Sequence, residues 1–396
     1  MSLSERLGVG PGDLVALRLP PGPAWLEAVT DLWAAGAAIL PLDVRSTPSE
    51  LRAIIALADP GVVESLDGTE IRAVGGSTGE RIGLVMPTSG TSGAPKLAEL
   101  SKEAVSAAVH SSTRALGASV DAPWVACLTP AHVGGMLVLL RAALLGASVI
   151  VHDRFDPGLL AEAAAHSDQD LFVSVVPAMV RRLVSSDMSL RGVTLLVGGG
   201  VLDPLIRAAA ERAGARVVTT YGLTETTGGV AYDGRPFPET EVRFVAEGAI
   251  ELRGPTVMTG YRHDPQATAE AFTIDGWLRT GDLGGFDEDG RIEVWGRSDD
   301  LIRSGAEKVW PQEVERALAD HPKVGDVAVA GAPDTEWGQH VTAFVVPARL
   351  EDPPSLDELQ THVEGRLARF KFPRELVLAA ELPRTSSGKI RRRDLR

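Results

Sequence analysis

The sequence predicts an α/β fold, in which layered, mostly parallel sheets are flanked by helices. Over the first two-thirds of the 396 residues, apolar segments with strand character alternate with helical segments, which indicates parallel strands covered on both faces. From Gly248 the pattern changes to short strands with tight turns, and a shorter α+β unit follows Gly296. We therefore expect a large N-terminal domain over residues 1–298, including a small β-rich subdomain, and a small C-terminal domain over residues 299–396.

The individual elements follow from local patterns. In the N-terminal part, strands are expected at 14–17, 147–151, 171–175 and 194–197, and a helix at 23–35. A short strand at 250–252 comes next, and the turn sequence at 287–290 leads into a strand at 291–295. The C-terminal unit should contain helices at 311–319 and 355–368 and strands at 327–329 and 342–346. Ligands are expected at the carboxyl ends of the parallel strands, where the glycine-rich segments fall.

The composition excludes several classes of partner. The formal charge of −14 argues against nucleic acid or an anionic membrane as the main partner. The single cysteine, Cys127, excludes a disulfide framework and a four-thiolate metal site, and it fits a reducing cytoplasm. No apolar run approaches the roughly 20 residues that a membrane helix needs. We expect a cytoplasmic protein without membrane insertion, and whether it forms a homodimer stays open.

A segment rich in glycine and hydroxyl groups, residues 88–96, is the most informative part of the sequence. Glycines let backbone N–H groups close on an anion, and hydroxyls with one ammonium add donors, so the segment is suited to a polyphosphate. It is not a Walker loop, because Ala94 and Pro95 separate the lysine from the preceding glycine. A flexible linker is the alternative, but a strand end precedes the segment and Ser101 indicates a helix N-cap after it. The candidate phosphate-binding residues are Thr88, Ser89, Gly90, Thr91, Ser92, Gly93 and Lys96.

Five further segments, together with this loop, carry a resemblance to a known superfamily. They read Tyr-Gly-Leu-Thr-Glu-Thr at 221–226, Asp-Gly-Trp-Leu-Arg-Thr-Gly-Asp at 275–282, Gly-Arg-Ser-Asp-Asp-Leu-Ile at 296–302, Ser-Gly-Ala-Glu-Lys-Val-Trp-Pro at 304–311 and Pro-Arg-Thr-Ser-Ser-Gly-Lys at 383–389. In this order, over nearly the whole chain, they resemble the adenylate-forming enzymes, which include acyl-CoA synthetases, firefly luciferase and the adenylation domains of peptide synthetases. Such a series is far more specific than any single motif.

The resemblance implies an acid–CoA ligase that uses ATP, Mg²⁺ and CoA. The substrate carboxylate would attack the α-phosphate of ATP, giving an acyl-adenylate and pyrophosphate, and the CoA thiol would then displace AMP. The resemblance also implies that the small α+β C-terminal domain is mobile. It would turn about a hinge at Asp299, presenting first Lys389 and then the loop at Gly305, along which the pantetheine arm of CoA passes.

Several residue types fit the chemistry of a nucleotide site. Glu225 is a hard oxygen donor that suits Mg²⁺ shared with nucleotide phosphates, whereas an isolated loop glutamate is usually only solvated. Asp282 can accept from the ribose hydroxyls, and Arg297 can donate to the same sugar. In the resembled enzymes, the counterpart of Tyr221 stacks on adenine. Besides the loop, the candidate nucleotide contacts by resemblance are Gly199, Tyr221, Gly222, Thr224, Asp282 and Arg297.

Lys389 is the expected catalytic cation. A carboxylate that attacks the α-phosphate brings two anions together, so an ammonium group at that point lowers the barrier. Lys389 precedes the basic run Arg391-Arg392-Arg393, for which we expect a solvated charged face or a weak attraction for the phosphates of CoA. The catalytic set that the resemblance implies is Lys389, Glu225, Thr224 and His132.

The acyl pocket is expected, by resemblance, beside His132 and the glycines Gly198 and Gly200. Nine residues after His132, Arg141 interrupts an apolar helix, and a buried cation needs an anionic partner. One interpretation places Arg141 at the pocket, near a second carboxylate of the acid, and the other is a salt bridge within the domain. The spacing of His132 and Arg141, with the sequence around 221–234, resembles the o-succinylbenzoate–CoA ligases of menaquinone biosynthesis, especially the short actinobacterial form.

Three positions depart from the pattern of the superfamily. Leu97 and Ala306 stand where glycine is usual, and Lys102 stands where histidine is usual. Leu97 would crowd the phosphate loop and could weaken adenylation. Three other functions stay open: a CoA ligase for another aryl or alkyl acid of secondary metabolism, an adenylation enzyme that loads a carrier protein, and a nucleotide-binding protein without catalysis. The joint presence of Lys389, Glu225, Asp282 and Arg297 speaks against the last.

Overall fold

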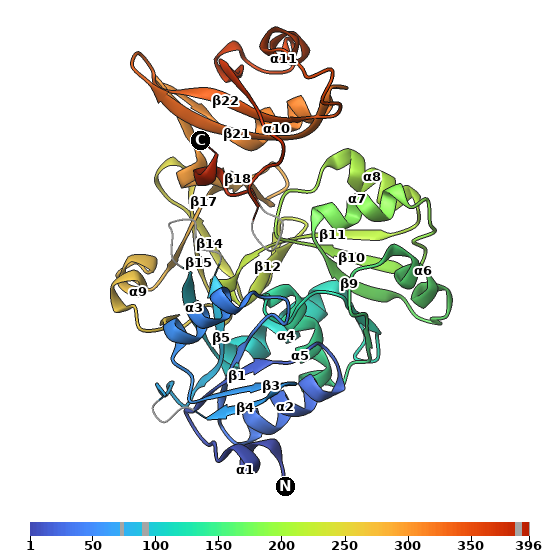
Figure 1. Cartoon of the computed structure of the whole chain (residues 1–396), viewed down its shortest axis with the longest axis vertical. Helices are drawn as coiled ribbons and strands as arrows, with labels where there is room; N and C mark the ends of the chain where they lie inside the picture. Colours follow the sequence, from blue (N-terminus) through green and yellow to red (C-terminus); the bar gives the residue numbers. More distant parts are fainter. Residues whose placement is uncertain (72–74, 89–94, 385–389, 396) are drawn as a thin grey trace. The chain divides into compact units, whose positions relative to one another are not determined.

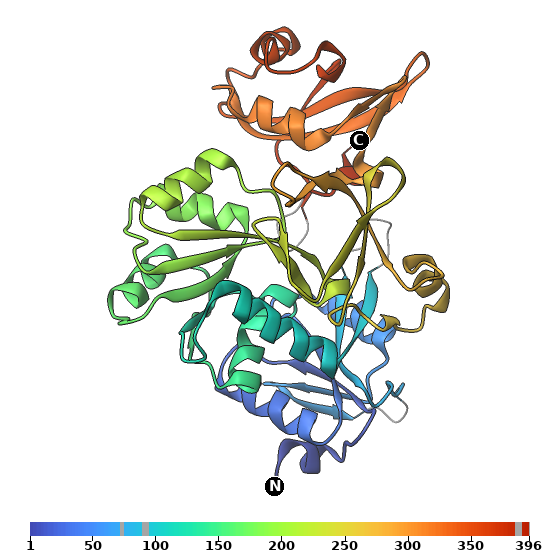
Figure 2. The same ribbon diagram turned by 180° about the vertical axis from the view of Figure 1, so that it is seen from behind.

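The structure, a computed structural model, describes residues 1–71, 75–88, 95–384 and 390–395 (Figures 1 and 2). The chain divides into two compact units. Unit 1 comprises Met1–Arg243, Glu251–Leu278 and Glu288–Ile292, and unit 2 comprises Phe244–Ile250, Arg279–Asp287 and Glu293–Arg396. The domain boundary expected after residue 298 stays a prediction. Within the described ranges, none of the helices combines the length and the apolar character needed to cross a bilayer.

Unit 1 contains two seven-stranded sheets. Sheet 1 has the order β16 (Gly260–Tyr261), β6 (Lys96–Ser101), β5 (Ile82–Thr88), β2 (Ala38–Pro41), β1 (Leu14–Arg18), β3 (Val62–Ser65) and β4 (Gly68–Ile71). Sheet 2 has the order β13 (Arg235–Pro236), β12 (Gly228–Tyr232), β11 (Arg216–Leu223), β10 (Val193–Val197), β9 (Leu171–Val175), β7 (Trp124–Ala126) and β8 (Val149–Val151). Within the series β5, β2, β1, β3 and the series β11, β10, β9, β7, β8, each strand is parallel to the next, whereas β6, β4 and β12 pair antiparallel with the ends of these series. The parallel series confirm the expected α/β class.

Helices cover both faces of each sheet, as the pattern predicted (Figures 1 and 2). One apolar cluster joins strand residues of both sheets, such as Leu84 and Leu196, to Val109 of α4 and Leu139 of α5. Separate clusters lie under α3 on sheet 1 and under α6, α7 and α8 on sheet 2. The helices of unit 1 are α1 (Leu3–Leu7), α2 (Pro23–Ala34), α3 (Pro48–Ala58), α4 (Lys102–Leu116), α5 (Val133–Leu145), α6 (Pro157–Ala165), α7 (Pro177–Ser185), α8 (Pro204–Arg212) and α9 (Pro265–Ala271).

The sequence specifies where these helices begin. Proline occupies the first turn of α2, α3, α6, α7, α8 and α9, where its missing N–H group costs no hydrogen bond. Thr47 and Glu50 form a capping box at the start of α3. Ser101 caps α4 by accepting a hydrogen bond from the backbone N–H of Ala104, as its position after the glycine-rich segment predicted.

Unit 2 is built around a five-stranded sheet that α10 (Pro311–Ala319) and α11 (Leu356–Val363) cover. The expected helix at 355–368 ends early, at Val363, because Glu364 takes an extended conformation with φ −61° and ψ 131°. This sheet has the order β20 (Glu307–Val309), β19 (Ile302–Ser304), β22 (Gly338–Pro347) and β21 (Val324–Asp334), and β23 (Glu375–Leu378) pairs with β22. A four-stranded sheet has the order β14 (Glu241–Phe244), β15 (Ala249–Arg253), β17 (Leu278–Phe286) and β18 (Ile292–Arg297).

Candidate nucleotide and catalytic site

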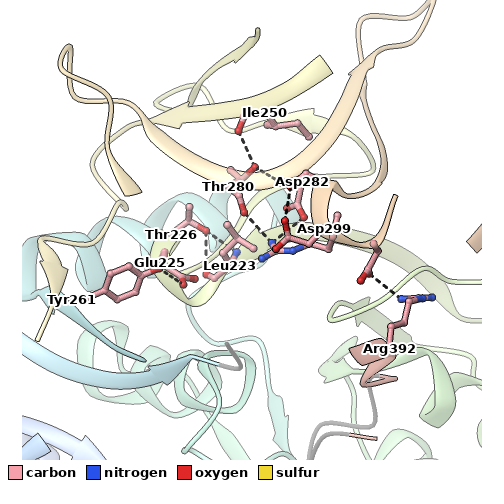
Figure 3. A network of polar contacts seen from close by, with 12 residues as sticks. Leu223, Glu225, Thr226, Ile250, Tyr261, Thr280, Asp282, Asp299 and Arg392 are labelled. Carbon is pink, nitrogen blue, oxygen red and sulfur yellow. Dashed lines mark hydrogen bonds and ion pairs between the residues drawn. The ribbon is translucent and has the colours of Figure 1, made fainter. Parts of the chain in front are cut away.

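The turn that carries Thr224 and Glu225 is a short 3-10 helix, Thr224–Thr226, between β11 and β12. The hydroxyl of the fully buried Thr226 accepts from the Leu223 N–H at 2.8 Å and contacts the Gly228 carbonyl at 2.8 Å (Figure 3). These hydrogen bonds stabilise the turn from its buried side. Thr224 and Glu225 are therefore held, partly exposed, at the carboxyl end of β11.

The carboxylate of Glu225 is oriented by Tyr261. The Tyr261 hydroxyl donates to Glu225 Oε1 at 2.8 Å (Figure 3), and the Lys96 ammonium lies 4.9 Å from the centre of the Tyr261 ring. Tyr261 is placed by β16, which pairs with β6, the strand that begins at Lys96. Unit 1 thus brings together a carboxylate suited to Mg²⁺ and a cation suited to phosphate.

Close backbone packing beside Tyr221 explains the glycine that follows it. A Cβ atom on Gly222 would lie 1.9 Å from the carbonyl oxygen of Gly228, so only glycine allows β11 and β12 to approach at this point. The pairing of the two strands shifts register between Tyr221 and Gly222. The bulge changes the direction of the chain just before Thr224, where β11 ends.

The predicted phosphate loop joins β5 to β6. Thr88, the last residue of β5, pairs with Lys96, the first of β6. The Leu97 side chain is 1% exposed and lies in the apolar cluster of sheet 1 and α3, which accounts for an apolar residue here. The remaining predicted contacts of the loop, and the predicted catalytic lysine, lie outside the described residues: Ser89, Gly90, Thr91, Ser92, Gly93 and Lys389.

His132 and the triple glycine lie at the same edge of sheet 2 as Thr224. His132 follows β7 and N-caps α5, Gly198 follows β10, and Thr224 follows β11. Because β7, β9, β10 and β11 are parallel, their carboxyl ends form one edge, the usual position of ligands in such sheets. The next two positions, Gly199 and Gly200, are exposed there.

Arg141 lies in the core beneath this edge and is 2% exposed. Its guanidinium stacks 3.9 Å over the Trp124 ring and donates to the Leu137 carbonyl at 2.8 Å and to the Ser112 hydroxyl at 2.5 Å. Nε donates to no described residue, and within the described ranges no carboxylate pairs with Arg141. Burial lowers the pKa of Arg141 to about 10, while interaction with Tyr232 raises it. The guanidinium is therefore charged at neutral pH, and the salt bridge expected as one alternative is absent from the described part of the chain.

In unit 2, Asp282 and Arg297 form the pair that the sequence predicted for ribose. Arg297 Nη1 donates to Asp282 Oδ1 at 3.0 Å and to the Thr280 carbonyl at 2.9 Å, and Asp282 is 6% exposed. The Thr280 hydroxyl donates in turn to the Ile250 carbonyl at 2.8 Å (Figure 3). β17 and β18 thus fix the carboxylate and the guanidinium in one place.

The proposed hinge and the proposed CoA loop also belong to unit 2. Asp299 is exposed in the 3-10 helix Ser298–Asp300, directly after β18. Gly305 forms the turn between β19 and β20 with φ +63°, and its N–H donates to the Trp337 carbonyl at 2.7 Å. A Cβ on Gly305 would lie 2.9 Å from the Trp337 ring, so glycine is required both by the torsion and by the space. The neighbouring Ala306 is exposed at the same turn.

Sequence reasoning missed Tyr261. The hydrogen bond to Glu225 joins residues 36 positions apart, and no local periodicity connects them. The available signal was composition, because the chain has only three tyrosines and tyrosine hydroxyls in partly buried positions usually bind a specific partner.

Comparison with known proteins gives a consistent result. The profile of the AMP-binding enzyme family matches residues 1–72 and 73–262, and the profile of the AMP-binding enzyme C-terminal domain matches residues 313–389. The chain is 34% identical over 440 aligned positions to a 2-succinylbenzoate–CoA ligase of Geobacillus kaustophilus, covering 98% of this chain and 88% of that protein. It is 36% identical over 343 positions to an indoleacetate–CoA ligase of Aromatoleum aromaticum, covering 79% of this chain and 66% of that protein.

Solved structures show the same likeness. The structure of an o-succinylbenzoate–CoA synthetase from Bacillus subtilis, in complex with its acyl-adenylate intermediate, superposes with a TM-score of 0.88 at 26% identity. The match covers 99% of this chain and 89% of the Bacillus chain. The likeness therefore extends over both units rather than over one shared motif.

Proposed function

The chain belongs to the AMP-binding enzyme family and is an AMP-forming acid–CoA ligase, and we propose that the acid it activates is 2-succinylbenzoate. The observation that carries the proposal is the likeness to 2-succinylbenzoate–CoA ligases over nearly the full length of this chain. In the first step, a carboxylate oxygen attacks the α-phosphorus of ATP and pyrophosphate leaves. In the second, the CoA thiol attacks the acyl carbonyl, and AMP leaves as the thioester forms.

The described residues fit the substrates of the first step. Glu225 would hold Mg²⁺ together with phosphate oxygens of ATP, since Mg²⁺ usually takes one or two carboxylates and completes its shell with phosphates and water. Tyr261 keeps that carboxylate in place, and Lys96 would contribute positive charge toward the phosphates. Asp282 and Arg297 would receive the ribose hydroxyls. Lys389 would stabilise the charge that develops on the α-phosphate.

The buried charge of Arg141 supports an acid with a second carboxylate. Arg141 is cationic at neutral pH, and its contacts are a ring, a carbonyl and hydroxyl groups rather than a carboxylate. In a medium of low dielectric constant such a charge acts over a longer distance than in water. Arg141 lies on α5, two and a half helical turns from His132. Its positive charge would therefore attract a substrate carboxylate bound at the edge of sheet 2.

Replacing Arg141 with leucine tests this assignment. We expect the KM for 2-succinylbenzoate to rise about 10-fold, which corresponds to about 1.4 kcal/mol, while the KM for benzoate changes less because benzoate has no second anion. Arg141→Lys keeps the charge and should retain most of the affinity. Initial rates at varied acid concentration give both constants, and an equal rise for the two acids would show that Arg141 only supports the fold.

A panel of acids tests the proposed substrate directly. Purified protein is incubated with ATP, Mg²⁺, CoA and one acid at a time, and the thioester is identified by mass spectrometry. We expect the highest kcat/KM for 2-succinylbenzoate. A higher value for any other acid of the panel would replace 2-succinylbenzoate as the substrate without affecting the assigned reaction.

Two other assignments are separated by the same assay. The likeness to an indoleacetate–CoA ligase favours a monocarboxylic aryl acid as the second candidate, and indoleacetate therefore belongs in the panel. If a carrier protein is the acceptor, acyl-adenylate will form with the preferred acid but free CoA will yield no thioester. An acyl carrier protein bearing its phosphopantetheine arm would then be acylated instead.

A further inference from the structure

One member of the basic run after Lys389 is not part of a solvated face. The side chain of Arg392 is 15% exposed, whereas those of Arg391 and Arg393 are 47% and 40% exposed. The expectation of a charged surface therefore fails for Arg392 alone. An arginine is rarely buried to this extent without paired partners, so its contacts indicate a specific role.

All three guanidinium nitrogens of Arg392 donate hydrogen bonds within unit 2. Nη2 donates to both carboxylate oxygens of Glu315 on α10, at 2.6 and 2.7 Å. Nη1 donates to Asp300 Oδ2 at 3.0 Å, and Figure 3 shows Arg392 at this contact. Asp300 is the last residue of the 3-10 helix Ser298–Asp300 and directly follows the proposed hinge residue. One guanidinium thus connects the C-terminal end of the chain to α10 and to the hinge segment.

The same pair of side chains also bonds the backbone of β21. Arg392 Nε donates to the Val329 carbonyl at 3.1 Å, and Glu315 Oε1 accepts from the Val329 N–H at 2.8 Å. On its other side, Val329 lies opposite Ala343 of β22. Arg392 is therefore attached to a strand in the apolar core of unit 2, which is a rigid support.

The described residues on either side of positions 385–389 pair with each other. Arg384 and Ile390 form an antiparallel bridge, and the Arg391 N–H donates to the Pro383 carbonyl at 2.8 Å. Arg384 pairs with Asp326 of β21 at 2.6 Å. Lys389 itself lies outside the described residues, but it is followed at once by a bridge residue and three residues later by Arg392.

We propose that Arg392 is a positioning residue for Lys389, and the proposal rests on the function proposed above. In this role Arg392 acts through its protein partners and not by contact with a substrate. It fixes the described residues that follow Lys389 in the sequence to β21, α10 and Asp300. Loss of this attachment should slow the step that needs Lys389, because a displacement of about 1 Å costs about 100-fold in rate.

The test separates the two half-reactions. For Arg392→Met, acid-dependent exchange between pyrophosphate and ATP should show a kcat lowered about 10- to 100-fold, with a smaller change in the KM for ATP. Conversion of supplied acyl-adenylate and CoA to thioester should stay within about 3-fold of wild type, since it does not use Lys389. Arg392→Lys keeps the charge but has a single nitrogen, and it should restore the exchange only in part.

Two further variants control for the loss of a positive charge and for misfolding. Arg393→Met changes an exposed arginine of the same run and should leave the pyrophosphate exchange unchanged. Arg392→Met leaves Glu315 buried and unpaired, which endangers folding, so the double variant Arg392→Met with Glu315→Gln is measured in the same assays. If the single variant does not fold, the double variant decides.

The outcomes distinguish this inference from the proposed function. Wild-type protein is measured first, and a lack of exchange with every acid would overturn the proposed function and this inference with it. If wild-type exchange is normal, equal loss of both half-reactions in the folded variants, or no loss in either, overturns the role of Arg392 alone. Selective loss of the exchange supports it.

Discussion

Replacing Lys389 with alanine should lower acid-dependent pyrophosphate exchange by about 10²–10³. The reason is that the attacking carboxylate and the α-phosphate are both anionic, and the transition state spreads further charge over the phosphate oxygens. The second step proceeds from a neutral acyl carbonyl and does not need that ammonium group. Thioester formation from supplied acyl-adenylate and CoA should therefore remain largely intact in the same preparation.

The control for this variant is another lysine of unit 2. Lys323 pairs with Asp352 and Glu358, both at 2.8 Å, and is assigned no part in either step. Lys323→Ala should leave both rates unchanged. Equal loss of the two half-reactions in Lys389→Ala, with the fold preserved, would refute a role confined to adenylation.

The local sequence pattern correctly predicted helices and strands that have a clear run or period of apolar residues. The apolar run at 171–175 is β9, buried in the middle of sheet 2, and the helix expected at 311–319 is α10 with the same bounds. The helix expected to reach residue 368 ends at Val363, because Glu364 turns to an extended conformation although apolar residues continue the pattern. Termination therefore depended on one torsion that periodicity does not encode.

The site was predictable as a set of residues but not as a set of contacts. Motif order identified Glu225, Asp282 and Arg297, and the structure adds what holds each of them. β16 consists of only two residues, and its partner strand β6 lies far from it in the sequence. No local signal in the sequence therefore indicates that Tyr261 reaches Glu225. Arg141 illustrates the same limit: its position in an apolar helix predicted burial, while its ring and hydroxyl partners come from β7 and α4.

Asp299→Pro should impair transfer of the acyl group to CoA by about 100-fold and spare adenylation. In the structure, Asp299 lies in a 3-10 turn, whose φ of about −50 to −70° a proline ring can adopt. Proline should therefore be accepted in this conformation. A rotation about residue 299 requires other torsions at the same position, and the ring removes that freedom.

The matched control is Asp299→Ala, which removes the carboxylate but keeps the backbone free to rotate. Both half-reactions should continue in this variant, so a defect confined to proline isolates the torsion as its cause. Pyrophosphate exchange and thioester formation from acyl-adenylate are measured on each protein. If proline abolishes the exchange but leaves CoA transfer intact, the conformation with a proline-like φ serves the second step, and the assigned order of domain positions is wrong. If proline changes neither rate, the chain does not turn at Asp299, and the anchored Asp300 beside it becomes a fixed part of unit 2 rather than the edge of a hinge.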